Sequence, residues 1–176
     1  MTKCQTVSDS LIHVFEQNHA SLAAEIDALD SILNVFCHEG RAQFGKNIRR
    51  LDNAIQRLQT RLDTVIGYEE KCLFPFINVH IPRFQPLIYL LLSEHEDFGK
   101  RLKSLARSLA AFKKEKGAAR QLKSLRKIKA EGMYLVCLMR SHLWAEAKKM
   151  YEAVNRELRA GEKEKLARRL KEFSLS

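Results

Sequence analysis

Apolar residues recur at alternating steps of three and four along four long segments of this 176-residue chain. An α-helix places residues at that spacing on one face, so each segment predicts a helix with a narrow buried stripe. The stripes run through residues 12–36, 44–76, 84–112 and 135–154. Four long helices with narrow stripes and short connections predict an all-α domain that forms an antiparallel, up-down-up-down four-helix bundle.

Start and stop signals separate the four segments. N-cap residues at positions 8–10 precede the first helix, and Pro86 suits the first turn of the third helix. Gly40, Gly117 and Gly161 stand where the first, third and fourth helices are expected to end.

The end of the chain differs from the rest in composition. Residues 161–176 are predicted to form a short, basic amphipathic C-terminal helix outside the bundle of residues 1–160. This helix keeps Leu166, Leu170 and Phe173 on one face. An apolar face of this kind covers the protein's own bundle or docks on a partner helix or a membrane surface.

Charge and hydropathy limit the classes of partner. The net charge of +10 raises the question of nucleic-acid binding. Much of the excess lies in residues 113–129 and 159–171, where solvated helix faces give the same count, so nucleic acid is not the favoured partner. No apolar run reaches the length of a membrane span, and the first ten residues lack the apolar core of a secretory signal. A cytoplasmic location without a membrane span is therefore expected.

The four cysteines stand singly, with no Cys-x-x-Cys pair. This pattern argues against a zinc finger, a thioredoxin-like protein and a disulfide scaffold. No nucleophile–base pair of the Ser-His or Cys-His type is evident, so hydrolase chemistry is not predicted. We expect a binding or sensing protein rather than an enzyme, although redox chemistry on small oxidants stays open.

Each apolar stripe is interrupted by residues that are able to bind a metal ion. They are His19, Glu69, His95, His142 and Glu146. Glu69 and His95 lie about 12 and about 14 residues from the turn between their helices, and His95 and His142 lie about 22 and about 25 residues from the next turn. In antiparallel helices such pairs come within about one turn of each other. His19 matches this level more loosely. The five residues are predicted to converge inside the bundle.

The residue types in this cluster point to a transition metal. Imidazole and carboxylate together suit iron, manganese or zinc. A carboxylate in a core stripe is costly unless it is paired or bound to a metal. His142 and Glu146 are one helical turn apart, so both can point at one centre. The alternatives are a polar network without metal and a ferritin-like di-iron site. A ferritin-like site needs two Glu-x-x-His motifs, and the chain has one, from Glu16 to His19.

Residues 65–76, VIGYEEKCLFPF, resemble the HxxxEExxLFP motif on the second helix of hemerythrin-like (HHE cation-binding) domains. The pair Glu94 and His95 resembles the EH motif on the third helix of these domains, and residues 141–151, SHLWAEAKKMY, resemble the HxxxE motif on the fourth. The histidine in NHASL, His19, matches the first-helix histidine. The resemblance spans roughly residues 8–158. It implies a helical bundle with a non-haem iron site whose metal ligands are His19, Glu69, His95, His142 and Glu146.

The sequence departs from the hemerythrin-like pattern at two positions. Oxygen-carrying hemerythrins hold two irons with five histidines and two bridging carboxylates. The resemblance aligns Glu69 and Glu146 with the carboxylates, but Val65 and Gly99 stand where two of the histidines are expected. Such a site would hold two metals if water or another carboxylate took the place of the missing histidines. The alternatives are a site for one metal and a site that no longer binds metal. The nearby carboxylates are Glu16, Glu70 and Glu96.

The function implied by the resemblance is binding or sensing of a small ligand such as dioxygen or nitric oxide, or of iron itself. The cofactor would be one or two iron ions or another divalent metal. The alternatives are a metal-free interaction module, whose basic surfaces bind an acidic partner or nucleic acid, and a mononuclear metal enzyme. Gly67 lies in the middle of the second helix and is interpreted either as space for a ligand or as ordinary drift.

Overall fold

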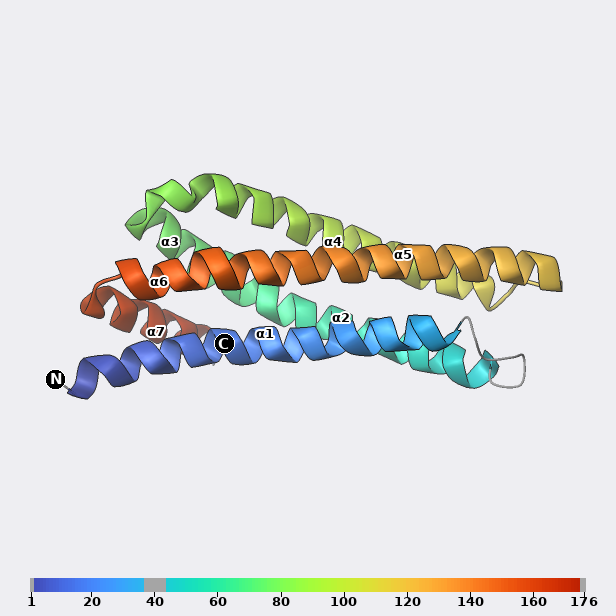
Figure 1. Cartoon of the computed structure of the whole chain (residues 1–176), viewed down its shortest axis with the longest axis horizontal. Helices are drawn as coiled ribbons and strands as arrows, with labels where there is room; N and C mark the ends of the chain where they lie inside the picture. The colour runs from blue at the N-terminus through green and yellow to red at the C-terminus, as the bar shows by residue number, and fades with distance from the viewer. Residues whose placement is uncertain (1, 37–43, 175–176) are drawn as a thin grey trace. The chain divides into compact units, whose positions relative to one another are not determined.

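The computed structural model describes residues 2–36 and 44–174, and it describes the side-chain environments of residues 14–35 and 45–173. Helices joined by short turns make up these two ranges, and no strand occurs within them (Figure 1). The all-α prediction is therefore confirmed. The expected helix end at Gly40 lies outside the described residues.

Four long α-helices carry most of the chain, and two of them continue through a π-helical turn into a further short helix. In chain order the elements are α1 (Thr2–Phe36), α2 (Phe44–Tyr68), the π-helix η2 (Glu69–Leu73), α3 (Phe74–His80), the 3₁₀-helix η3 (Pro82–Phe84), α4 (Gln85–Phe112), α5 (Ala118–Ala145), the π-helix η4 (Glu146–Tyr151), α6 (Glu152–Glu157) and α7 (Ala160–Ser174).

Two of the predicted helix boundaries are wrong. Helix α1 begins at Thr2 and not after the capping residues at positions 8–10. Helix α6 ends at Glu157, because Leu158 has an extended backbone with φ −73° and ψ 133°. The Arg159 N–H donates a 2.8 Å hydrogen bond to the Glu162 carboxylate, three residues ahead. This is one half of a capping box, and it starts α7 before Gly161.

Contacts divide the chain into two compact units. Unit 1 contains Met1–Ser21, Leu62–His95 and His142–Ser176, and unit 2 contains Leu22–Arg61 and Glu96–Ser141. Each of the long helices contributes a segment to both units.

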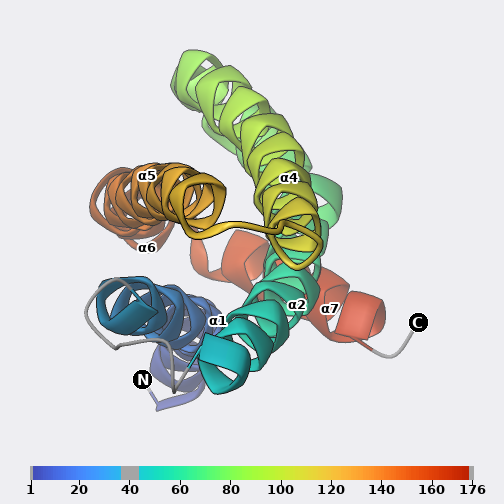
Figure 2. The same ribbon diagram turned by 90° about the vertical axis from the view of Figure 1, so that its right-hand side faces the viewer.

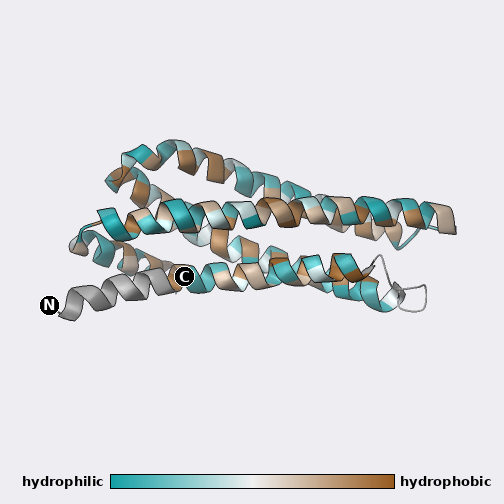
Figure 3. Ribbon diagram, in the orientation of Figure 1, coloured by the Kyte–Doolittle hydropathy of each residue, from teal (hydrophilic) through white to brown (hydrophobic). Residues whose placement is uncertain are grey.

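Unit 2 has an apolar core, and its described part contains a sharp turn between α4 and α5. Its α4 and α5 segments are joined by residues 113–117 (Figure 2). Gly117 has a φ of 101°, which favours glycine, and α5 begins at the next residue. The predicted turn is therefore present, but α4 already ends at Phe112 and not at Gly117. Helices α1 and α5 approach closely at Gly132, where an added Cβ would clash with Leu33 Cδ1. Where Figure 3 colours the helices by hydropathy, hydrophilic and hydrophobic residues are interspersed along them, as expected of helices that bury one face.

Unit 1 includes α7, which packs against η2. Leu166 and Leu170 are buried there, and Phe173 is half-buried. A Cβ added to Gly67 would lie 3.3 Å from Phe173 Cζ. The apolar face of α7 thus covers part of unit 1, and Phe173 occupies the space beside Gly67, where one interpretation of the sequence places a ligand.

Candidate metal centre

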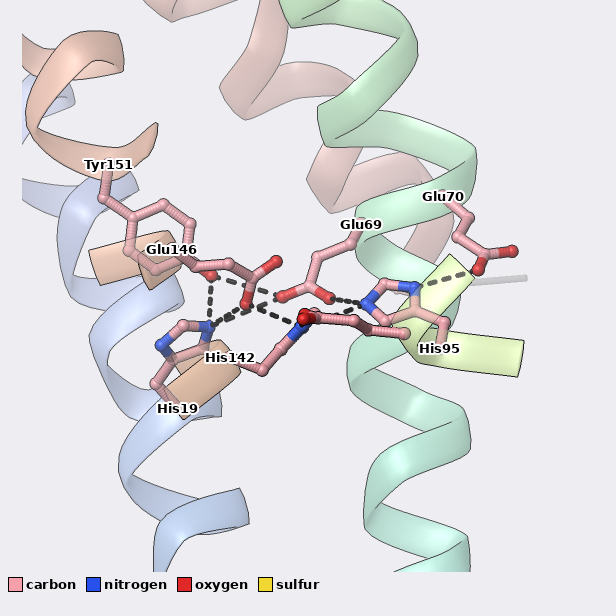
Figure 4. A network of polar contacts seen from close by, with 8 residues as sticks. His19, Glu69, Glu70, His95, His142, Glu146 and Tyr151 are labelled. Carbon is pink, nitrogen blue, oxygen red and sulfur yellow. Dashed lines mark hydrogen bonds and ion pairs between the residues drawn. The ribbon is translucent and has the colours of Figure 1, made fainter. Parts of the chain in front are cut away.

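The structure brings the five predicted site residues together inside unit 1. His19 comes from α1, Glu69 from η2, His95 from α4, His142 from α5 and Glu146 from η4, and all five are buried (Figure 4).

The closest part of this cluster is a group of four residues. Ligand atoms of Glu69, His95, His142 and Glu146 all lie within 4.8 Å of one another. His19 joins from the other side, where its Nε2 lies 3.4 Å from Glu69 Oε1 and 3.1 Å from Glu146 Oε2. The cluster therefore has two sides that share the same two carboxylates.

Both carboxylates sit at the first residue of a π-helical turn. Glu69 begins η2 and Glu146 begins η4. A π-helix forms i→i+5 hydrogen bonds, so it inserts one residue into the α-helical repeat and changes which side chain lies above the carboxylate. Such turns are frequent at functional sites. Here they shift the helix register at the positions where the carboxylates enter the core.

The turn in η4 places Tyr151, five residues after Glu146, in the cluster. Its hydroxyl oxygen lies 2.5 Å from His19 Nε2 and 3.3 Å from Glu69 Oε1. The ring stacks on Phe15 with a centroid separation of 4.8 Å and an interplanar angle of 16°.

Sequence reasoning missed Tyr151 as a site residue. α-Helical spacing continues the stripe from Glu146 to Met150, and Met150 is indeed buried. Tyr151 lies one position off that stripe, and it is buried at the end of the π-helical turn, which adds a residue to the α-helical repeat. The sequence signal was limited to a tyrosine next to the stripe.

Two further carboxylates contact the imidazoles of His95 and His142 at Nδ1, the ring nitrogen on the far side from the shared carboxylates. His95 Nδ1 lies 2.9 Å from Glu70 Oε1, and His142 Nδ1 lies 2.7 Å from Glu94 Oε2. A carboxylate at Nδ1 keeps the N–H on that nitrogen and turns the Nε2 lone pair toward the centre. Glu70 is one of the three additional carboxylates that the sequence offers as ligands. In the structure it contacts Nδ1 of His95 and so orients this imidazole.

The other two extra carboxylates lie outside the cluster. Glu16 is exposed, and Glu96 belongs to unit 2, where it forms an exposed ion pair with Lys100.

The geometry of the cluster fits a bound cation. His95 Nε2 and His142 Nε2 lie 3.1 Å apart. With both Nδ1 atoms protonated, two lone pairs would face each other unless a proton or a metal lies between them. In addition, Glu69 Oε2 and both Glu146 oxygens are buried without a hydrogen bond from any described residue. Buried acceptors of this kind each cost about 1–3 kcal/mol, which a cation among them would offset.

The electrostatics of the site favour positive charge. Burial lowers the pKa of His19, but the close carboxylates of Glu146 and Glu69 outweigh it and raise the pKa to about 9. Burial raises the pKa of Glu69, but the close imidazoles of His19 and His95 outweigh it and lower the pKa to about 2. Burial and the charge of Glu69 raise the pKa of Glu146 to about 7. Burial also raises the pKa of Tyr151. Without a metal, protons supply the positive charge that these carboxylates require.

A comparison with protein families matches residues 10–131 to the hemerythrin HHE cation-binding domain. The chain belongs to the hemerythrin HHE cation-binding domain family. The match confirms the resemblance seen in the sequence. It includes His19, Glu69 and His95 and ends before His142 and Glu146. A comparison with curated proteins gave no match.

Together, the HHE domain and the buried His/Glu cluster suggest metal binding. At the departure from the hemerythrin-like pattern, Val65 is buried in α2, one turn before Glu69. Among the described residues, none of the helices combines the length and apolarity needed to cross a bilayer.

Proposed function

We propose that this HHE domain binds two iron ions in the buried cluster and, through them, binds or senses a small ligand such as dioxygen or nitric oxide, or iron itself. The helices would form the antiparallel four-helix bundle of the sequence prediction, followed by the basic C-terminal helix. The observation that carries the proposal is the convergence of four buried ligand atoms within 4.8 Å, beside carboxylate oxygens that lack hydrogen bonds.

The two carboxylates support a pair of ions rather than one. Glu69 directs Oε1 toward His19, at 3.4 Å, and Oε2 toward His95, also at 3.4 Å. Glu146 Oε2 lies 3.1 Å from His19 Nε2 and 3.4 Å from His142 Nε2. Each carboxylate therefore lies between His19 on one side and the His95–His142 pair on the other, as a bridging ligand would.

Residues around the ligands hold them in place and keep water out. Glu70 and Glu94 orient the imidazoles of His95 and His142. Phe74 stacks on His95 with centroids 5.6 Å apart and an interplanar angle of 17°. Iron bound here would supply reversible one-electron chemistry and an open coordination position for a small ligand.

The test is the metal content of the full chain, purified without a metal-affinity tag from iron-supplemented cells. We expect about two irons per chain and charge-transfer absorption of ligated ferric iron in air. His142→Ala and Glu69→Ala should lose both, whereas His80→Ala should keep them, because His80 pairs with Glu162 on α7 outside the cluster. About one iron per chain would replace the pair by a mononuclear site. No bound iron, and no change in stability with iron or chelator, would overturn the proposal.

A second candidate function is the metal-free interaction module. A hollow of about 340 Å³ is lined by Phe76, Val79 and His80 of α3 and by Lys165, Arg168, Arg169 and Glu172 of α7. Its positive charge favours an acidic partner. Salt-sensitive binding of an acidic polypeptide by the iron-free chain, lost in Lys165→Ala/Arg168→Ala, would support this function. The cytoplasmic location and the separation of residues 161–176 as a tail stay predictions.

A further inference from the structure

The two sides of the cluster are unequal in nitrogen ligands. His95 and His142 serve one side, and His19 alone serves the other. Val65 provides an apolar side chain at the position where a second-helix histidine was expected. An ion beside His19 would thus have one nitrogen and the two shared carboxylates, and it would need a further donor.

The hydroxyl of Tyr151 lies on the side that lacks a ligand. It is 2.5 Å from His19 Nε2 and 3.3 Å from Glu69 Oε1, so three different donor atoms gather there (Figure 4). Ligand atoms that share one metal at about 2.0–2.2 Å lie roughly 3 Å from each other. The separations of the hydroxyl from His19 Nε2 and Glu69 Oε1, 2.5 Å and 3.3 Å, lie on either side of this value, so the three atoms are grouped closely enough to share one ion.

Two features hold the phenol in this position. The π-helical turn that starts at Glu146 carries Tyr151 onto the core face of the helix. Phe15 then stacks on its ring and fixes the plane of the phenol. A tyrosine whose hydroxyl only needed a hydrogen-bond partner would not require a change of helical register at the same residue as a shared carboxylate.

We propose that Tyr151 is a metal ligand, which binds the ion beside His19 through its phenol oxygen. This inference rests on the proposed iron site. The centre is then unsymmetrical: one ion has His19, Tyr151 and the shared carboxylates, and the other has His95, His142 and the same carboxylates. On binding, the phenol O–H bond breaks, the proton leaves to solvent, and the oxygen lone pair forms the bond to the metal.

An anionic phenolate changes the properties of the ion that it binds. Hard, anionic oxygen donors favour ferric over ferrous iron. With iron bound, the ion on the His19 side would therefore be the harder one to reduce, and the ion on the His95–His142 side would be the easier one. The protein should also be visibly coloured, because phenolate transfers charge to ferric iron on absorbing visible light.

The test uses the full chain, made metal-free with a chelator and then loaded with ferrous iron in air, whose dioxygen oxidises the metal. We expect a visible absorption band, and Raman excitation within it should enhance the ring vibrations of tyrosine. Tyr151→Phe keeps the ring on Phe15 and removes only the oxygen, so it should abolish the band while retaining at least one iron. The matched control is Tyr89→Phe on α4, whose side chain is largely exposed.

The outcomes separate this inference from the proposed function. About two irons per chain without the tyrosine vibrations, or a band that survives in Tyr151→Phe, would overturn the ligand role and leave the iron site standing. No bound iron would overturn both. If circular dichroism shows that Tyr151→Phe does not fold, the Raman measurement on the unaltered chain decides alone.

Discussion

Unit 1 and unit 2 are built from segments of the same four long helices, but their cores differ in chemistry. The buried polar residues of unit 1 are His19, Glu69, His95, His142 and Glu146, whereas the described part of unit 2 buries one, Asn47. Leu29, Leu58 and Leu105 are typical of the unit 2 core and are fully buried.

The ion pairs of the two units differ in the same way. In unit 2, Arg57 pairs with Glu25 at 3.0 Å while half of the arginine side chain stays exposed. Such surface pairs contribute about 0–1 kcal/mol. In unit 1, the carboxylate of Glu146 is completely buried beside His19 and His142. Burial of that charge is costly without a cation. The comparison teaches that unit 1 buries whole carboxylates, whose charge protons or a metal must balance, whereas the described core of unit 2 contains no fully buried charged residue.

The largest expected effect is a stability difference between the units on removal of iron. Saturating metal stabilises a folded site by about 4 kcal/mol when free metal is about 1,000 times the dissociation constant. We expect chelation to speed amide hydrogen exchange in η2 and η4 of unit 1, with a smaller change in unit 2. Equal changes in both units would show that they unfold as one and would break the comparison.

The next effect is the pH dependence of the iron-free chain. His19 has a pKa of about 9 in the folded chain and an ordinary value of 6.5, so its proton stabilises the fold fully below pH 6.5 and ceases to do so as the pH rises to 9. Glu146, with its pKa raised from 4.5 to about 7, acts in the same direction at lower pH. Glu69, with its pKa lowered to about 2, stabilises above pH 4.5 and less as the pH falls toward 2.

The iron-free chain should therefore be most stable near pH 5. Between pH 6.5 and 9 it should lose on the order of 3 kcal/mol, as measured by urea unfolding with chelator present. In His19→Gln the free energy of unfolding should change much less between pH 6.5 and 9. With iron bound the slope should reverse, since metal displaces the proton from His19. Stability of the iron-free chain that rises over this range would contradict the electrostatic account of unit 1.

A smaller effect is expected on iron affinity, and it should differ between Glu94 and Glu96, which stand two residues apart on α4. Glu94→Ala removes the carboxylate behind His142 Nδ1 and should weaken iron binding by about 10–100-fold. Glu96→Ala removes an exposed partner of Lys100 in unit 2 and should leave the affinity unchanged. A competitive titration with an iron chelator measures both. Equal iron affinities of the two variants would contradict the role of Glu94 in positioning His142.

The smallest effect is expected at the surface of unit 2. Arg57→Ala should change the free energy of unfolding by less than about 1 kcal/mol and leave the iron content intact. Urea unfolding and elemental analysis check the two parts. A loss of several kcal/mol would mean that the surface pairs of unit 2 matter as much as the buried cluster of unit 1.

The sequence by itself determined the helices, the stripe residues that they bury and the polar residues that interrupt the stripes. From Phe15 to Leu33, every member of the first stripe is buried, and the five predicted site residues meet in one cluster. These features depend on a repeat of 3.6 residues and on the polarity of each side chain, both of which are local.

Only the tertiary structure decided which other residues join the site. The π-helical turns at Glu69 and Glu146 shift the helical repeat, so Tyr151 could not be placed by α-helical counting. The contact of Glu94 with His142 joins residues 48 positions apart. Neither feature leaves a periodic signal, because each depends on how packed helices bring side chains together around a shared centre of charge.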